Sequence, residues 1–106
     1  MGGSRLVRPI HIARLDKIRP ALVLTRHAVR AQRNRVTVAP ITSTIWGLET
    51  EVLVGRANGL DHESVINCDS IVTIPVDDLG RQIGVLQPGQ EAELAAAIVA
   101  AFDLDL

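Results

Sequence analysis

Short apolar runs that alternate with polar residues recur along most of the chain, which is the period of half-buried β-strands. Gly, Pro, Asn and Asp residues separate these runs at intervals of about 8 to 12 residues, a spacing typical of a small, mostly antiparallel barrel. Six strands are predicted, at residues 9–15, 19–25, 35–41, 49–54, 64–68 and 82–86. We expect a loop or irregular helical turn at 26–34, a break in the sheet at 73–75, and a turn or one-turn helix at 76–80.

The last segment predicts an amphipathic helix over residues 90–102. Glu91 and Glu93 fall in its first turn, where the helix dipole favours carboxylates. Apolar residues recur at the spacing of one helical face that packs on a sheet, namely Leu94, Ala97, Ile98, Ala101 and Phe102. The predicted fold class is therefore α+β and β-rich, a small antiparallel barrel with a C-terminal amphipathic helix.

The composition indicates an aliphatic core. Apolar residues make up 47% of the chain, yet Trp46 and Phe102 are its only aromatic residues apart from histidine. Cys68 has no second cysteine for a disulfide, which fits a reducing cytoplasm, and no apolar run approaches the roughly 18 residues of a membrane span. We expect a cytoplasmic protein with a leader at residues 1–7 and a single domain at 8–106.

Charge is distributed unevenly along the chain, although the net charge is only −1. Residues 1–42 contain nine of the eleven Lys and Arg residues against one acid, whereas residues 43–106 contain two against eleven acids. Such a split suggests a surface that binds a polyanion or an acidic peptide. If the two halves interleave in a small barrel, however, the charges mix on the surface.

The stretch 36–43 runs from the strand at 35–41 into two adjacent hydroxyls, Thr42 and Ser43, and Arg19 begins the strand at 19–25. Two neighbouring strands could bring these three residues to one rim of a sheet. A guanidinium beside hydroxyls is suited to phosphate binding, because arginine presents a rigid fork of donors and stays charged at neutral pH. Taken alone, a surface salt bridge and turn hydroxyls would explain the same residues.

Further motifs follow in a fixed order along the chain. They are Arg19-Pro20 before an aliphatic strand, Ala-Pro-Ile-Thr-Ser at 39–43, Gly-Leu-Glu-Thr-Glu-Val at 47–52, Gly-Leu at 59–60, Ser-Val-Ile-Asn-Cys-Asp at 64–69, Leu-Gly-Arg-Gln-Ile-Gly at 79–84, and the terminal helix. The series resembles the MazF/PemK toxins of bacterial type II toxin–antitoxin modules over residues 9–104.

This resemblance implies an SH3-like barrel that forms a homodimer and acts as a sequence-selective endoribonuclease on single-stranded RNA. It further implies cleavage without a metal or other cofactor, leaving 2′,3′-cyclic phosphate and 5′-hydroxyl ends. The partner that it implies is a MazE-like antitoxin whose acidic, disordered tail covers the active site.

By the same resemblance Arg19, Thr42, Ser43 and Asp69 are the candidate catalytic residues. Arg19 would clamp the phosphate, and the two hydroxyls would donate hydrogen bonds to it. Asp69 would act as base or hold Arg19 in place, although an ordinary turn acid explains it as well. The chain departs from the family pattern at Val72, where many relatives have a second cation.

RNA contacts are expected from the loop residues. Arg26, Arg30 and Arg33 would line the RNA groove, or else merely solvate their loop. Trp46 would stack on a base or else plug a dimer interface, two interpretations that the sequence leaves open.

Two other functions fit the same barrel. One is a non-catalytic interaction toxin of the gyrase-poison type, which uses an aromatic tip on the C-terminal helix, whereas residues 103–106 read Asp-Leu-Asp-Leu. The other is a degenerate subunit that binds the antitoxin without cleaving RNA.

Overall fold

The computed structural model describes residues 7–30 and 32–106, so the expected leader lies outside the described residues except for Val7. Short strands are the main regular structure of the chain, and η denotes one turn of 3₁₀ helix. The elements are β1 (Pro9–Arg14), β2 (Ile18–Val23), α1 (His27–Arg30), β3 (Arg35–Thr42), β4 (Glu51–Val54), η1 (Arg56–Asn58), β5 (Ser64–Asn67), η2 (Cys68–Ser70), β6 (Val72–Pro75), η3 (Val76–Asp78), β7 (Leu79–Val85) and α2 (Gln90–Ala101).

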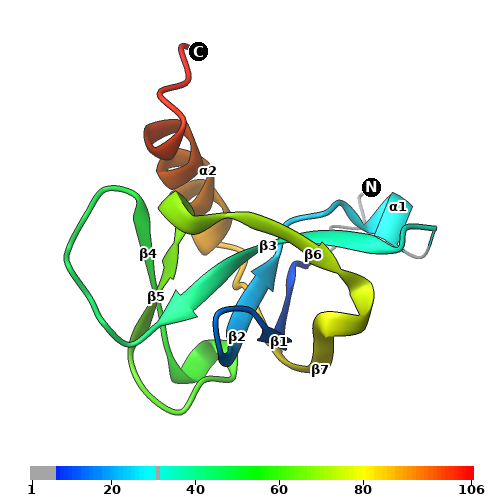
Figure 1. Ribbon diagram of the computed structural model, residues 1–106. Coiled ribbons are helices and arrows are strands. Elements are labelled where there is room, and N and C mark those ends of the chain that lie inside the picture. The colour runs from blue at the N-terminus through cyan, green and yellow to red at the C-terminus, as the bar shows by residue number, and fades with distance from the viewer. Residues whose placement is uncertain (1–6, 31) are drawn as a thin grey trace.

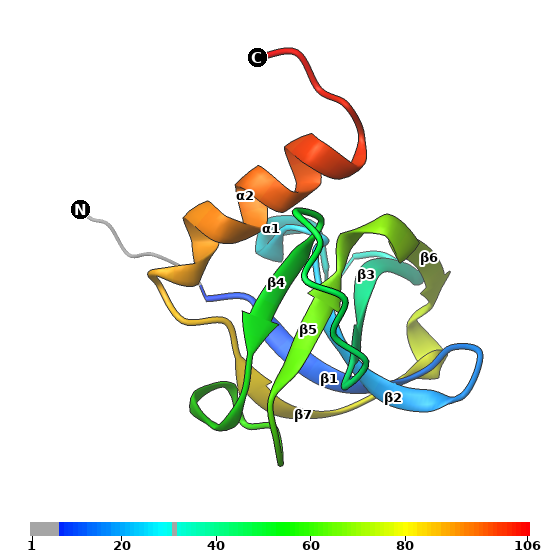
Figure 2. The same cartoon turned by 90° about the vertical axis from the view of Figure 1, so that its left-hand side faces the viewer.

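The strands form one curved antiparallel sheet in the order β4-β5-β3-β2-β1-β7, with β6 paired to the first half of β3. The sheet curls on itself, and α2 lies across it beside β4 (Figures 1 and 2). The predicted β-rich α+β fold with a C-terminal helix is confirmed. None of the helices within the described ranges has the length and apolar character that a membrane span needs.

Strand β3 holds the barrel together, because its alternating side chains enter two aliphatic cores. Ala39 and Ile41 belong to a core beneath α2, and Val36 and Val38 belong to a second core on the other side of the strand. Strand alternation thus explains how an 8-residue strand supports both cores. Cys68 is buried as a free thiol in the first core, as the absence of a second cysteine predicts.

Helix α2 buries the middle of its predicted apolar face and leaves the end outside. Leu94 and Ala97 are buried, but Phe102 is 56% exposed, so its placement on the packed face was wrong. The helix ends at Ala101, because Asp103 adopts a left-handed conformation with φ of 53° and Leu104 N–H bonds back to the Val99 carbonyl. This turn carries Phe102 away from the sheet.

The expected break at 73–75 was also wrong, since these residues lie within strand β6. Its register with β3 runs from Val38↔Val72 to Arg35↔Pro75. Pro75 is tolerated because it is the last residue of the strand, where its missing N–H costs least.

Two glycines allow the chain to cross itself beneath the loop that follows η1. A Cβ at Gly59 would lie 2.1 Å from the Ile83 carbonyl oxygen, and one at Gly84 would lie 1.7 Å from that of Asn58. The Asn58 side chain is buried here, where it accepts from the Gly55 N–H and donates to the Val85 carbonyl. This close contact fixes the position of Gly59 against β7, and with it the start of the segment 60–64.

Candidate active site

The antiparallel register of β2 and β3 brings Arg19 and Thr42 together. The ladder pairs Val23 with Val38, Leu22 with Ala39 and Ala21 with Pro40. The pairing ends at Ala21 and Pro40, and beyond it Arg19 and Thr42 both line the same two hollows of the surface. The sequence-based expectation that these two strands place Arg19 near Thr42 therefore fits the strand geometry.

Arg19 is held by a carboxylate that sequence reasoning did not assign to the site. Its Nε and Nη2 donate to Asp16 Oδ1 and Oδ2 at 3.1 and 3.0 Å, across the tight turn between β1 and β2. The Arg19 side chain is only 17% exposed, so the fork is held in one orientation. Partial desolvation raises the pKa of Asp16, but the Lys17 backbone N–H and the Arg19 guanidinium outweigh it, and the pKa lies below its ordinary value.

The two hydroxyls stand at the end of β3. Thr42 Oγ1 accepts the Thr44 backbone N–H at 3.1 Å, which leaves the proton of the hydroxyl available to a ligand. Ser43 follows in an exposed position at the edge of the same site. Both can donate to an anion that also contacts Arg19.

Two adjoining hollows meet at this pair. A hollow of about 410 Å³ is lined by Arg19, Thr42 and Ser43, together with Lys17, His62 and Arg81. A second hollow of about 450 Å³ is lined by Asp16, Arg19 and Thr42, together with Trp46, Asn67 and Ser70. Arg19 and Thr42 line both, so a chain lying along the two hollows would pass over them. Within the described part of the protein, no group of three or more His, Cys, Asp or Glu side chains is arranged to bind a metal ion.

Asp69 does not hold Arg19, contrary to one of its two expected roles. From Val38 to Ile41 β3 advances three residues, whereas its partners advance six, from Ile66 to Val72. The one-turn helix η2 takes up the difference and turns Asp69 out of the ladder. Its carboxylate accepts the Thr50 hydroxyl at 2.6 Å instead, and it lines neither hollow.

The three loop arginines, Arg26, Arg30 and Arg33, line neither of these two hollows, and their contact with RNA stays a prediction. They lie around α1, which follows the far end of β2, and Arg26 and Arg33 border a separate hollow with Arg35 and Thr37. Thr37 is roughly 17 Å along β3 from Thr42 at the usual strand rise. The basic stretch between β2 and β3 therefore reaches a different end of the barrel.

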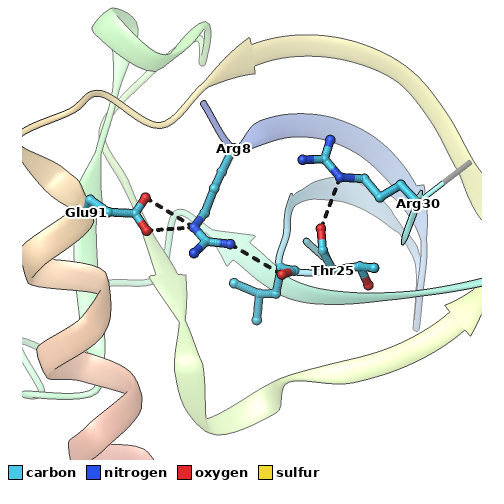
Figure 3. A network of polar contacts seen from close by, with 5 residues as sticks. Arg8, Thr25, Arg30 and Glu91 are labelled. Carbon is cyan, nitrogen blue, oxygen red and sulfur yellow. Dashed lines mark hydrogen bonds and ion pairs between the residues drawn. The ribbon is translucent and has the colours of Figure 1, made fainter. Parts of the chain in front are cut away.

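Arg30 forms part of a polar network at this far end (Figure 3). Its Nε donates to the Thr25 carbonyl at 3.0 Å, while Arg8 donates to Glu91 of α2 at 2.8 Å and to the Leu24 carbonyl. Burial lowers the pKa of the Arg30 guanidinium, and the nearby charge of Arg8 lowers it further. Arg8 thus joins α2 to the segment that follows β2, and Arg30 ties α1 to the same segment.

Several groove residues were missed by sequence reasoning. Lys17 and Arg81 bring cations into the first hollow from the β1–β2 turn and from β7, although Val72 leaves none at its own position. Asp16 had one detectable signal, an acid three residues before an arginine across a tight turn. Lys17 and Arg81 had none, because their approach depends on how the sheet curls.

The molecule is a small curved barrel with a guanidinium and hydroxyls in an open groove, an arrangement suited to phosphate groups. A family model described as PemK-like, MazF-like toxin of type II toxin-antitoxin system matches residues 8–102. The chain belongs to this family, so the family predicted from the sequence is confirmed. Its expected enzyme class, endoribonuclease, is confirmed with it.

Individual relatives agree with the family assignment. Endoribonuclease MazF3 of Mycobacterium tuberculosis is 62% identical over 99 residues, which cover 93% of this chain and 96% of that protein. Probable endoribonuclease MazF5 of the same organism is 33% identical over 86 residues, covering 80% and 79%. The structure of M. tuberculosis toxin MazF-mt6 matches with a TM-score of 0.92 at 62% identity, covering 93% of this chain and 100% of that chain.

Proposed function

We propose that this toxin cleaves single-stranded RNA sequence-selectively, without a metal, by attack of a ribose 2′-hydroxyl on the adjacent phosphate. The products would be a 2′,3′-cyclic phosphate and a 5′-hydroxyl. The observation that carries the proposal is the meeting of Arg19 and Thr42 where two open hollows join. The scissile phosphate would lie over this pair, with the flanking nucleotides in the two hollows.

Arg19 is the group that stabilises the phosphorane-like transition state. Asp16 engages Nε and Nη2, so both N–H groups of Nη1 remain free for phosphate oxygens. A guanidinium already fixed by its carboxylate needs little reorganisation when negative charge develops, which is the condition for electrostatic catalysis. Thr42 and Ser43 add hydroxyl donors, and Lys17 and Arg81 supply further positive charge along the first hollow.

Proton transfer requires an acceptor for the 2′-hydroxyl proton and a donor for the leaving 5′-oxygen. Asp16 is better placed than Asp69 as the acceptor, because it lines a hollow with Arg19 and Thr42 and Asp69 does not. The lowered pKa of Asp16 keeps it ionised at neutral pH, although it also makes the carboxylate a weaker base. Asp69 as base remains a prediction that Asp69→Asn tests.

The partner we propose is a MazE-like antitoxin whose acidic tail occupies the cationic groove of a toxin homodimer. Lys17, Arg19 and Arg81 line the first hollow and would pair with such a tail. A structure described as an endoribonuclease in complex with its cognate antitoxin from a mycobacterial species shares the fold at a TM-score of 0.83 and 24% identity.

The test is incubation of the purified protein with total cellular RNA in EDTA, followed by mapping of new 5′ ends. We expect discrete sites whose 5′ ends are hydroxyls. Arg19→Ala should lower the cleavage rate by about 10²- to 10³-fold, the usual cost of one transition-state donor. Arg56→Ala is the matched control, because Arg56 is an exposed arginine of η1 that lines neither hollow.

The assay separates the proposal from its rivals. Cleavage that survives Arg19→Ala unchanged would move the active site elsewhere. Phosphate-bearing 5′ ends, or cleavage that EDTA abolishes, would contradict the proposed chemistry. A folded protein that leaves RNA intact would instead be a non-catalytic toxin or an antitoxin-binding subunit.

A further inference from the structure

The Glu51 carboxylate accepts hydrogen bonds from the backbone of the loop that follows Thr42. Gly47 N–H donates to Oε1 at 2.8 Å and Leu48 N–H to Oε1 at 3.1 Å, while Trp46 N–H reaches both carboxylate oxygens at 3.2 and 3.3 Å. Glu51 N–H in turn donates to the Leu48 carbonyl at 3.1 Å. Charge-assisted hydrogen bonds of this kind are stronger than neutral ones, so Glu51 fixes three consecutive residues of the loop.

This loop presents Trp46 to solvent instead of burying it. Trp46 is 76% exposed, which is unusual for a large aromatic residue. Gly47 makes the turn with φ of 77°, and the Thr42 hydroxyl holds the Thr44 N–H at the other end of the loop. The backbone beneath the ring is therefore tied at both ends, so only the side-chain torsions of Trp46 are left to order when a ligand binds.

Trp46 also lies beside the reacting groups. It lines the same hollow as Arg19 and Thr42, whose other walls include Asn67 and Ser70. A cation and a hydroxyl for a phosphate, an aromatic face, and polar groups for a base edge are together the requirements of a nucleotide site. The three N–H groups on Glu51 disperse its negative charge, which reduces its repulsion of an approaching phosphate.

We propose that Glu51 is a positioning residue that holds Trp46 as a stacking platform for the RNA base next to the scissile phosphate. The inference rests on the proposed ribonuclease function and names one determinant of which RNA is bound. An aromatic platform of this kind increases affinity for an unpaired base and leaves the chemical step to Arg19 and Thr42. Loss of the platform should weaken RNA binding far more than it slows cleavage of bound RNA.

Trp46 is the single tryptophan of the chain, so its emission reports on the platform directly. The probe is an oligoribonucleotide spanning a mapped cleavage site, with a 2′-deoxynucleotide 5′ to the cut to prevent reaction. We expect its binding to quench Trp46 emission with the same Kd that fluorescence anisotropy of end-labelled RNA gives. Trp46→Ala should raise that Kd by about 5- to 150-fold, the range known for loss of one base–aromatic stack. Trp46→Phe should recover most of the affinity.

Glu51→Gln tests the positioning role, with Glu49→Gln as the matched control. Glu49 is an exposed carboxylate of the same segment, and its substitution removes the same charge. We expect Glu51→Gln to raise the Kd and KM severalfold and to increase acrylamide quenching of Trp46 in the free protein, while kcat changes less than about twofold. Adding Glu51→Gln to Trp46→Ala should change the Kd for RNA little further, because Glu51 acts on RNA binding through Trp46.

The outcomes distinguish this inference from the proposed function. Three outcomes would overturn this inference and leave the proposed function standing. RNA could bind and be cleaved without quenching Trp46, which would rule out the platform. The effects of Glu51→Gln and Trp46→Ala could be fully additive, or Glu51→Gln could equal Glu49→Gln, and either result would rule out the positioning role of Glu51. Emission that changes with protein concentration but not with RNA would show the ring covered by a second copy, and would also overturn the platform. No RNA binding by either readout would refute the platform and the proposed function together. Urea unfolding followed by circular dichroism checks that each variant is folded.

Discussion

Gly84→Ala should destabilise the fold severely, although it adds a single methyl group. The new Cβ would lie 1.7 Å from the carbonyl oxygen of Asn58 and 2.6 Å from its carbonyl carbon. Both contacts are with backbone, so no side chain can rotate to relieve them. Strand β7 and the end of η1 would have to separate by more than about 1 Å, against the close packing of the interior.

The cost can be worked out from what Asn58 does at this crossing. Forced overpacking typically costs about 1–3 kcal/mol. Separation also stretches the bonds of the buried Asn58 amide, which donates to the Val85 carbonyl at 3.0 Å and to Gln90 Oε1 at 2.6 Å. Each weakened buried bond costs about 1 kcal/mol. We therefore expect a loss of roughly 3–5 kcal/mol from a total of about 5–15 kcal/mol, or a Tm lower by about 20 °C.

Urea unfolding followed by circular dichroism, at one fixed protein concentration, measures this loss. Gly89→Ala is the control, because a Cβ there meets nothing within 4 Å and Gly89 has an ordinary φ of −67°. Its free energy of unfolding should stay within about 0.5 kcal/mol of the parent value. A Gly84→Ala protein within about 1 kcal/mol of the parent would refute the reasoning, since the two backbones would then have room to part.

Two further predictions concern the core. Leu94→Ala should cost about 2–5 kcal/mol, because Leu94 of α2 is buried in the first core, whereas Phe102→Ala should cost under about 1 kcal/mol. Equal losses in urea unfolding would contradict the placement of Phe102 outside the core. Burial, and then the nearby Asp69 charge, raise the pKa of the Cys68 thiol to about 11 in the folded protein. The unfolded chain has a cysteine pKa of about 8.5, so it releases this proton first as the pH rises. The stabilising contribution of Cys68 should therefore be complete below about pH 8.5 and lost as the pH rises toward 11, and Cys68→Ala should remove that part of the pH dependence of unfolding; an unchanged profile would contradict the shift.

The regular elements could be predicted because their sequence patterns are local. Residues 9–14 and 35–42 alternate or concentrate β-branched side chains, and the terminal segment repeats with the helical period. Strand β6 could not be predicted in the same way. Its four residues contain Pro75, which argues against a strand, and only pairing with the first half of β3 makes them one.

The candidate site likewise has features that the sequence predicts and features that depend on the folded chain. The proximity of Arg19 and Thr42 follows from two neighbouring strands and their register, which an antiparallel sheet largely dictates. Asp16 pairs with Arg19 only because the connection between β1 and β2 is short enough to fold back. The departure of Asp69 from the ladder depends on the one-turn helix η2, whose presence no periodicity in residues 68–70 reveals.

The structure separates the groups proposed for chemistry from those proposed for recognition. Arg19 and Thr42 belong to the paired strands β2 and β3, which are anchored by the fully buried residues Ala21, Leu22 and Ala39. Trp46 stands on a loop beyond the ladder, whose backbone is held by side chains, chiefly the Glu51 carboxylate. Loops tolerate substitution far better than paired strands do. If the proposed chemistry is correct, changes in this loop should alter which RNA is bound while cleavage continues at the same pair of residues.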